Sequence, residues 1–432
     1  MYYNRTEEEL NLQFQGVPPN SISSGGAAAT GGSPSFANPF ADVAGIAPTA
    51  PNPFPFVGAA SNVAFTAASG NLPVWSGCCS ALDQNNVDPT SYNYSLTIER
   101  QLSKSMILSV GYVGSEGHHL EIGHPKNLVT NLAPCLADTT CNAGNQLYKY
   151  PGDFLYPGTN PNINQYGSID TISNIGNSRY NSMQVGLKKN MSHGLQFTAN
   201  YTWSHAFDNG SGFENSSFGG FGFGSLAASR AYNPYLPASD YGPSAYDARQ
   251  RLVIGYTYQI PGVHSGSGLV SRVTNGWIIS GITTLQKGFP MDVVDSSDPS
   301  LRCYPGNSDF ACMDVPNVVA PVQYTNWKLP GNQWFSPSSF ASAPEGTFGN
   351  APRNMLQGPG INNWDFQLSK DTKITETTRM ELRIEFYNLF NRTQILSSAA
   401  IITDINYGPA FGHVFSDNGV PREIQLAAKF YF

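Results

Sequence analysis

Apolar and polar residues alternate along many short stretches of this chain, which is the period-two pattern of β-strands. In the clearest stretch, 195–204, every second residue is apolar: Leu195, Phe197, Ala199, Tyr201 and Trp203. The same alternation predicts ten strands, around 10–14, 92–99, 106–112, 183–188, 195–204, 251–260, 277–286, 363–369, 380–390 and 422–432. The chain is therefore expected to be all-β.

The connections between these segments alternate in length. Long ones cover about 16–91, 116–179, 207–248, 288–361 and 391–421, whereas the others are short or intermediate: 103–105, 190–194, 261–275 and 371–377. An up-and-down membrane barrel has this rhythm, because its tight turns face the periplasm and its long loops face outward. We therefore predict an antiparallel transmembrane β-barrel segment of about ten strands with long extracellular loops.

Charged residues of the predicted strands fall on the polar phase of the alternation. A Lys or Arg that faces lipid at the bilayer midplane costs about 2–4 kcal/mol, so a barrel wall should turn such residues inward. The lumen-facing candidates are Arg251, Glu381, Arg383 and Glu385. They could form a ladder of cross-strand pairs or contact a plug or solute. A soluble β-sandwich would also segregate charge, but it would not explain the alternating connections.

The last strand ends on a terminal aromatic. Phe430 and Phe432 share its apolar face, and no polar tail follows them. A closing strand of an outer-membrane barrel has this form, since it needs an apolar face toward lipid. We predict Phe430 and Phe432 as the C-terminal insertion signal read by the barrel-assembly machinery.

Composition agrees with a membrane β-protein. Among 432 residues, charged residues make up only 12% and aromatic residues another 12%, with 43 Gly and 31 Pro. No run of about 18 apolar residues occurs, which excludes a helical membrane protein. The net charge of −7 argues against nucleic-acid binding. The first nine residues lack the features of a secretory signal, so we expect the C-terminal part of something longer, or a truncated or mis-started gene.

Six cysteines give a weaker signal. Cys135 with Cys141, and Cys303 with Cys312, are local pairs in polar, Gly- and Pro-rich stretches. They are predicted to form loop disulfides in an oxidising compartment, with free thiols as the alternative. Zinc binding is disfavoured, because the tight ligand spacing and nearby histidines are missing.

Two clusters carry metal-binding residue types. Glu116, His118, His119, Glu121 and His124 lie close together in the sequence, and so do Asp292, Asp295 and Asp298. The first is better explained by a strand that runs out into a polar loop, and the second lacks the ligand-and-glycine pattern of an EF-hand. No G-x-S-x-G, H-E-x-x-H or P-loop motif occurs. We predict no enzyme, no metal site and no cofactor.

Several motifs in order resemble the C-terminal barrel of TonB-dependent, Oar-like outer-membrane proteins, the acidobacterial type with an N-terminal carboxypeptidase-regulatory-like domain. They lie at 91–100, 111–115, 179–184, 199–205, 246–251 and 381–391, followed by the terminal Phe432. The resemblance implies a 22-stranded barrel around a plug, energised through a TonB box. The plug, the regulatory domain and a TonB box are not recognisable here, so residues 1–432 are expected to be one partial barrel domain.

Three functions follow as hypotheses. The first is a barrel segment of a TonB-dependent transporter or receptor for an unidentified large solute, not active alone. Its partners would be outer-membrane lipid, the barrel-assembly machinery, the missing plug and strands, and TonB. The second is a non-transporting surface protein that mediates adhesion through its long loops. The third is a soluble secreted β-protein.

Overall fold

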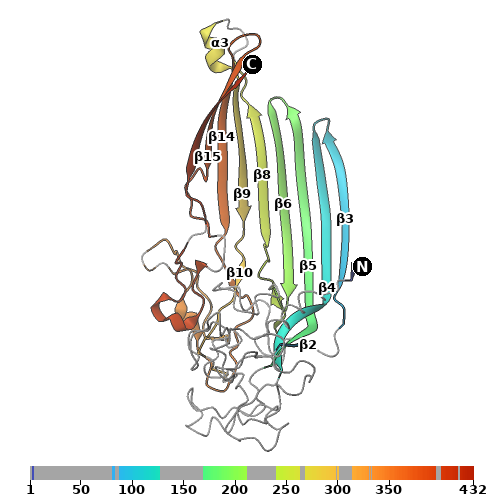
Figure 1. Ribbon diagram of the computed structural model, residues 1–432, viewed down its shortest axis with the longest axis vertical. Coiled ribbons are helices and arrows are strands. Elements are labelled where there is room, and N and C mark those ends of the chain that lie inside the picture. The colour runs from blue at the N-terminus through green and yellow to red at the C-terminus, as the bar shows by residue number, and fades with distance from the viewer. Residues whose placement is uncertain are drawn as a thin grey trace, which may run out of the picture.

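The structure is a computed structural model dominated by one curved antiparallel sheet (Figure 1). It describes residues 2–3, 80–82, 87–126, 169–211, 240–262, 268–297, 299–300, 314–329, 331, 333–395, 400–416 and 419–432. Within these residues, no helix is long and apolar enough to cross a membrane.

Nine long strands build the sheet within the described residues. They are β3 (Thr90–Ser103), β4 (Met106–Lys126), β5 (Ile169–Ser192), β6 (Leu195–Asp208), β8 (Gln250–Gln259), β9 (Trp277–Gln286), β14 (Ile361–Lys373), β15 (Arg379–Tyr387) and β16 (Glu423–Tyr431). Each coincides with one of the alternating segments, so these strand predictions are confirmed. The tenth expected segment, 10–14, lies outside the described residues.

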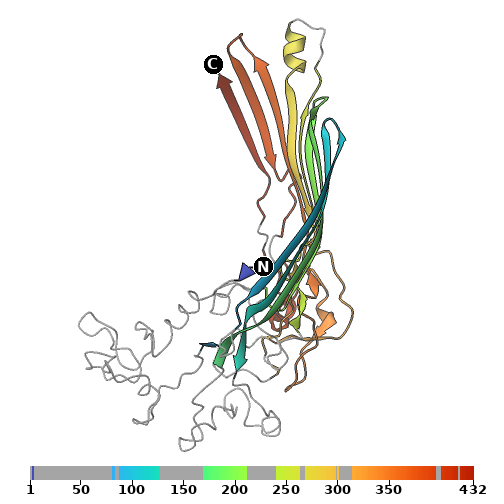
Figure 2. The same cartoon turned by 90° about the vertical axis from the view of Figure 1, so that its right-hand side faces the viewer.

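Each long strand pairs with the next one along the chain, in the order β3-β4-β5-β6-β8-β9-β14-β15-β16. Three two- or three-residue strands attach to this sheet: β1 (Tyr2–Tyr3) to β3, β2 (Ser80–Leu82) to β5, and β7 (Gly242–Pro243) to β6. The strands β3 and β16 stand at opposite sides and do not meet (Figure 2). The prediction of an antiparallel meander is confirmed, and the described sheet is open.

One end of the sheet, which we call the turn end, carries the short connections. The link between β5 and β6 is the two-residue turn His193-Gly194, with φ of 52° and 76°. Both values are positive, as a type I′ hairpin turn requires, and this turn matches the twist of the flanking strands. The link between β8 and β9 at this end contains the short helix α3 (Leu269–Thr274).

The opposite end, which we call the loop end, carries the long connections. Strands β4 and β5 extend further toward the loop end than the alternation predicted, with 21 and 24 residues. The loop expected at 116–179 is therefore shorter than predicted, because both of its ends belong to these strands. Ile169–Ser178 contains many polar residues, so no apolar period marks it. Backbone pairing with β4 holds this part, for example at Gly117↔Ser178 and Ile122↔Ser173.

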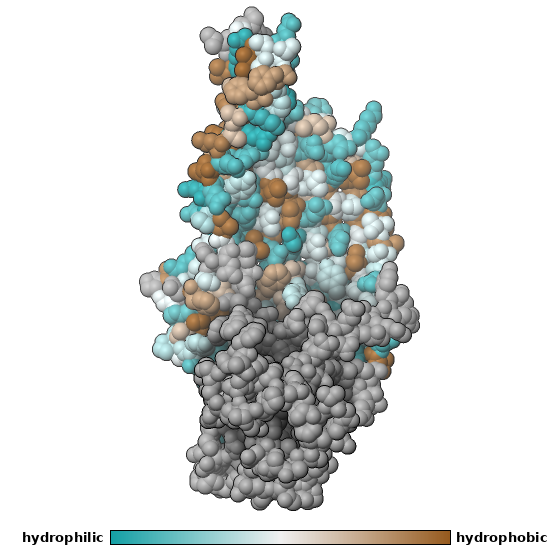
Figure 3. All heavy atoms as spheres, in the orientation of Figure 1, coloured by the Kyte–Doolittle hydropathy of each residue, from teal (hydrophilic) through white to brown (hydrophobic). Residues whose placement is uncertain are grey.

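The apolar face of the sheet is exposed. Leu96 and Ile98 of β3 are 67% and 66% exposed, and Leu426 of β16 is 74% exposed. Apolar side chains lie at the surface among polar ones across the strands (Figure 3). Exposed apolar area of this extent marks a surface that contacts something other than water.

Further short elements lie in the two connections 288–361 and 391–421. They are β10 (Pro290–Met291), β11 (Asn317–Val318), η6 (Pro337–Ser339), β12 (Phe340–Ala341), β13 (Leu356–Gln357) and η8 (Ile405–Ala410). Strand β10 pairs with β13, and β11 pairs with β12. We call the described residues of these two connections the loop cap.

Candidate functional site

The loop cap has a hydrophobic core of its own. Seven side chains are buried together in it: Met291, Val293, Phe335, Phe340, Leu356, Ile401 and Phe411. The rings of Phe335, Phe340 and Phe411 meet edge to face, with centroids 5.2–5.8 Å apart. Aromatic pairs favour this geometry, which adds about 0.5–1.5 kcal/mol per pair beyond area burial. The two long connections are therefore packed against each other.

A buried charged cluster joins the loop cap to the end of β6. Arg353 Nη2 lies 3.0 Å from Asp208 Oδ1, and the side chains are only 1% and 9% exposed. Arg353 Nη2 also donates to Ser211 Oγ over 2.9 Å. The Ser211 hydroxyl lies 2.7 Å from both Asp208 carboxylate oxygens and accepts a hydrogen bond from Ala245 N–H. We call Asp208, Ser211 and Arg353 the buried clamp.

A neighbouring bond strengthens this junction. Asn354 Nδ2 donates to the Pro243 carbonyl over 2.7 Å, next to the buried clamp. Breaking one partner of a buried ion pair leaves an uncompensated charge, which typically costs about 3–5 kcal/mol. The junction therefore fixes where the loop cap sits relative to the sheet.

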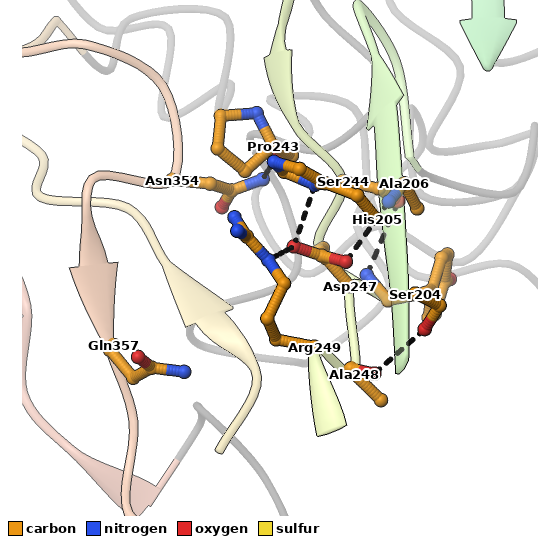
Figure 4. A network of polar contacts seen from close by, with 12 residues as sticks. Ser204, His205, Ala206, Pro243, Ser244, Asp247, Ala248, Arg249, Asn354 and Gln357 are labelled. Atoms are coloured by element: carbon orange, nitrogen blue, oxygen red, sulfur yellow. Dashed lines mark hydrogen bonds and ion pairs between the residues drawn. The ribbon is translucent and has the colours of Figure 1, made fainter. Parts of the chain in front are cut away.

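Asp247 forms a second polar hub at the loop end (Figure 4). Its Oδ1 accepts from Ala206 N–H over 2.9 Å, and its Oδ2 accepts from Arg249 Nε over 3.1 Å. His205 Nδ1 lies 3.1 Å from the same Oδ2, without hydrogen-bond geometry. The side chain of Asp247 is 3% exposed. Because its partners lie on β6 and immediately before β8, the hub aligns these two strands where they meet the loops.

Buried carboxylates also lie inside the loop cap. Asp295 and Asp314 pair through their backbones and are both fully buried. Asp295 Oδ1 accepts from Ser297 N, Ser297 Oγ and Asn406 Nδ2. Burial alone raises the pKa of Asp295, but hydrogen bonds from Ser297, Ser342 and Asn406 outweigh burial and lower the pKa below its ordinary value. Asp295 is therefore a charged structural anchor.

The two clusters of metal-binding residue types, for which no metal site was predicted, have other partners in the described structure. Asp292 accepts from Asn354 N–H, Asp295 is engaged as above, and Asp298 lies outside the described residues. Glu116 pairs with Arg179 at 3.5 Å, and His118 Nδ1 lies 3.0 Å from Asn177 Oδ1. Across the described part of the chain, no group of three or more His, Cys, Asp or Glu side chains could hold a metal ion.

A cavity of about 680 Å³ opens at the loop end beside β4 and β5. Its polar lining includes Glu116, His118, Arg179 and Tyr241. Register pairs Tyr92, Glu116 and Arg179 in one row, which lies on the same face as Leu96. The cavity therefore opens on the apolar side of the sheet, beyond the apolar stretch. Burial raises the pKa of the Tyr241 phenol, an effect that Arg179 partly offsets, so this group stays neutral at physiological pH.

The four predicted lumen-side charges share one face of the sheet but do not form one cluster. Arg251 pairs across to Gln286 and Ile361, whereas Arg383 pairs to Ser369. Ile361 and Ser369 lie eight residues apart on β14, a separation of about 26 Å along a strand. The face that these four residues occupy is the polar one, and its orientation toward a lumen stays a prediction.

On β15 the other three charges do meet. Arg383 Nε lies 2.5 Å from Glu381 Oε1, and Arg383 Nη1 lies 3.8 Å from Glu385 Oε1. Tyr431 of β16 donates to Glu381 Oε2 over 2.9 Å. The two ion pairs run along β15 itself, and the Tyr431 hydrogen bond is the contact that crosses to β16.

The other residues singled out in the sequence are the C-terminal aromatics and four cysteines. Phe430 lies opposite Met380 on β15, and Phe432 is 97% exposed, so the C-terminal aromatic is accessible. All four cysteines of the predicted loop disulfides, Cys135, Cys141, Cys303 and Cys312, lie outside the described residues. No pattern in the sequence predicts the buried clamp. Arg353 follows a Gly- and Pro-rich loop with no periodicity, and no local signal links it to Asp208.

One family profile and several solved structures are similar to the chain. The profile of a family described as outer membrane beta barrel domain matches residues 1–425. No curated protein sequence matches the chain. The outer membrane transporter YddB from Escherichia coli is 9% identical, with a TM-score of 0.39 over 82% of this chain and 34% of that chain. The ferripyoverdine receptor of the Pseudomonas aeruginosa outer membrane is 12% identical, with a TM-score of 0.32 over 80% of this chain and 27% of that chain. The chain thus spans about a third or less of either protein.

Proposed function

The chain belongs to the outer membrane β-barrel domain family, and from that premise we propose that it forms part of the barrel wall and the solute-facing loops of a TonB-dependent, Oar-like transporter or receptor. The proposed solute is too large for passive diffusion through a porin. On this proposal the 432 residues are one partial domain that acts with a plug, further strands and TonB. Membership of the family places the chain in the outer membrane.

The main support for this proposal is that the loop cap has a hydrophobic core of its own. Connections that only join strands need no core, yet 288–361 and 391–421 bury Phe335, Phe340 and Phe411 together. The buried clamp then fixes the cap to β6 through Arg353. A fixed surface at the mouth of a barrel is suited to recognising one solute, because little ordering is left to be done on binding.

The ordered motifs give the second support. The segments at 91–100, 179–184, 199–205 and 381–391 resemble Oar-like barrels, and the strands that contain them belong to one meander. The polar face of that meander carries the paired row Glu381, Arg383 and Glu385. In the proposal this row belongs to the wall and faces the plug.

Whole-cell uptake tests the proposal. The gene, in its native genomic context, is expressed in Gram-negative cells with and without TonB, and cells are offered labelled ferric chelates, cobalamin and oligosaccharides. We expect one solute class to accumulate only in cells with TonB, and Arg353→Met to weaken its binding. If the protein instead mediates adhesion, cells should bind surfaces equally with and without TonB and should accumulate no solute. That result would overturn the proposal of a transporter.

A further inference from the structure

The cavity of about 680 Å³ at the loop end belongs to the sheet and not to the loop cap. Its lining comes from β4, β5 and two residues beside β6 and β7, and β4, β5 and β6 are neighbours in the sheet (Figure 1). Its volume lies within the range of about 300–1,000 Å³ in which proteins bind small molecules. The side chains that line it therefore decide which ligand it fits.

One cation and one carboxylate face each other in the cavity. Arg179 Nε lies 3.5 Å from Glu116 Oε1, and the two side chains are 58% and 34% exposed. A charge-assisted hydrogen bond is shorter, about 2.7–2.9 Å, so both groups keep bonding capacity for a ligand. A guanidinium only donates and a carboxylate only accepts, whereas a hydroxyl group does both. Hydroxyl groups can therefore bridge this pair, but the carboxylate would repel an anion.

Amide and imidazole groups line the adjacent part of the cavity. Asn209 is only 4% exposed, and its Oδ1 accepts from Asn177 N–H over 2.6 Å. Asn177 Oδ1 lies 3.0 Å from His118 Nδ1. These contacts hold the polar groups in place before a ligand binds, which lowers the cost of binding. The lining thus offers fixed donors and acceptors, as a ligand with several hydroxyl groups requires.

Aromatic rings flank the polar lining on both sides. Tyr241 stacks on Phe207 of β6, with 5.9 Å between the ring centroids and 14° between the ring planes. On the other side, Tyr92 of β3 meets the His118 ring edge to face at 5.9 Å. Register places Tyr92 and Phe207 at the two ends of the row that contains the ion pair. A sugar ring suits such walls, because its C–H faces are apolar and pack on aromatic rings, while its edges carry hydroxyl groups.

An aromatic belt lies next to the cavity on the same face of the sheet. The Tyr112 hydroxyl donates to Asn181 Oδ1 over 2.6 Å, and Trp203 is 53% exposed. Register places Tyr112 and Trp203 in one row with Leu96, four residues along the strands from the ion pair. Tyr and Trp gather where membrane meets water. Because the family is one of the outer membrane, this belt points to lipid headgroups as the neighbours of the cavity.

We propose that the cavity binds a sugar ring in the headgroup of a membrane glycolipid. Glu116 and Arg179 bond to hydroxyl groups of the ring, and Tyr241 packs on its C–H face. The lipid chains then run past the exposed Leu96, a contact that a free saccharide lacks. The site lies on the face opposite Arg383, so it is separate from the row that the proposed function turns toward a plug.

Lipid retention tests this assignment in the full chain. The protein is refolded into dilauroylphosphatidylcholine vesicles that contain equal small amounts of dilauroylphosphatidylglycerol and of the glucosyl, galactosyl and mannosyl dilauroylglycerols. After transfer to detergent, native mass spectrometry counts the lipids that stay bound. We expect at least one sugar-bearing lipid to be retained about 10-fold more than the anionic lipid. The matching methyl glycoside, which has the ring but no chains, should displace little of it.

Substitutions test the two parts of the site. Arg179→Met and Tyr241→Ala should each lower the retention of the sugar-bearing lipid about 10-fold, whereas Tyr241→Phe keeps the ring and should keep most of the binding. Tyr241 lies outside the long strands, so Tyr241→Ala tests the site without a change in β5. Arg379→Met is the matched control, because Arg379 is 49% exposed and paired with Asp371 at the turn end. It should leave retention unchanged.

Three results would overturn the assignment. Equal or absent retention of the sugar-bearing and anionic lipids would mean that hydroxyl groups do not select the ligand. Full displacement by the methyl glycoside would identify a free saccharide as the occupant. Equal effects of Arg179→Met and Arg379→Met would place the binding elsewhere on the chain. Because no readout depends on solute uptake or TonB, a failed transport test leaves this inference standing, and the reverse also holds.

Discussion

Apolar side chains are exposed on the sheet and buried in the loop cap. In the sheet, Leu96 and Ile98 are about two-thirds exposed, whereas in the loop cap Phe335 is fully buried. We expect two surroundings for one chain, with lipid against the apolar face of the sheet and water around the cap. The sheet is held by backbone ladders and needs no core. The cap lies beyond the long strands and must build a core to stay folded.

The largest effect is expected from a substitution that leaves a cavity in the hydrophobic core of the loop cap. Phe335→Ala removes a buried ring and should cost about 3–5 kcal/mol. We expect proteases to cleave within 288–361 while the sheet keeps its resistance. Limited proteolysis of the protein in vesicles measures both regions at once. Phe415→Ala is the matched control, because Phe415 lies in the cap but is exposed. Equal sensitivity of sheet and cap would contradict their independence.

Substitutions in the buried clamp test whether it attaches the loop cap to the sheet. Arg353→Met leaves the Asp208 carboxylate buried without its cation, which should cost about 3–5 kcal/mol. We expect the cap to keep its core but to detach from β6, and hydrogen exchange at Ala245 N–H should report this loss. Adding Asp208→Leu to Arg353→Met should recover part of the stability. If Arg353→Met were neutral, the clamp would not hold the cap.

Substitutions on the two faces of β15 test which face of the sheet contacts lipid. Leu382 lies on the apolar phase and Arg383 on the polar phase beside Glu381. Leu382→Arg places a cation toward lipid and should cost about 2–4 kcal/mol. Arg383→Leu should disturb assembly less. Heat-modifiable mobility after refolding into vesicles measures folded yield, and the reverse ranking would mean that the faces are exchanged.

The smallest expected effect is the acid response of the loop cap. Hydrogen bonds hold the folded pKa of Asp295 below its unfolded value, so its ionisation stabilises the cap. This stability is fully present above the ordinary aspartate pKa of about 3.9 and is lost as the pH falls through the lower folded pKa. Proteolytic resistance of the cap should therefore decline at acid pH and less steeply in Asp295→Asn. An identical decline in both proteins would exclude Asp295 as a contributor.

The sequence predicted the sheet well and the candidate site poorly, for physical reasons. Alternation at 195–204 is a local property of a strand with one apolar and one polar face, so it is visible in sequence. Ile169–Ser178 lacks it, because that part of β5 projects past the apolar stretch and is held by pairing with β4. The clamp joins Asp208 to Arg353 across much of the chain, and such a contact exists only after the loops have packed.

The clamp also has a mechanical consequence. Arg353 is tied to Asp208, the last residue of β6. A pull on the loop cap along the axis of β6 would load the ladders with β5 and β8 in shear. Every rung then bears part of the force at once, whereas a pull across the strand would open the rungs one after another. Tension applied at the mouth would thus be carried along the wall toward the turn end.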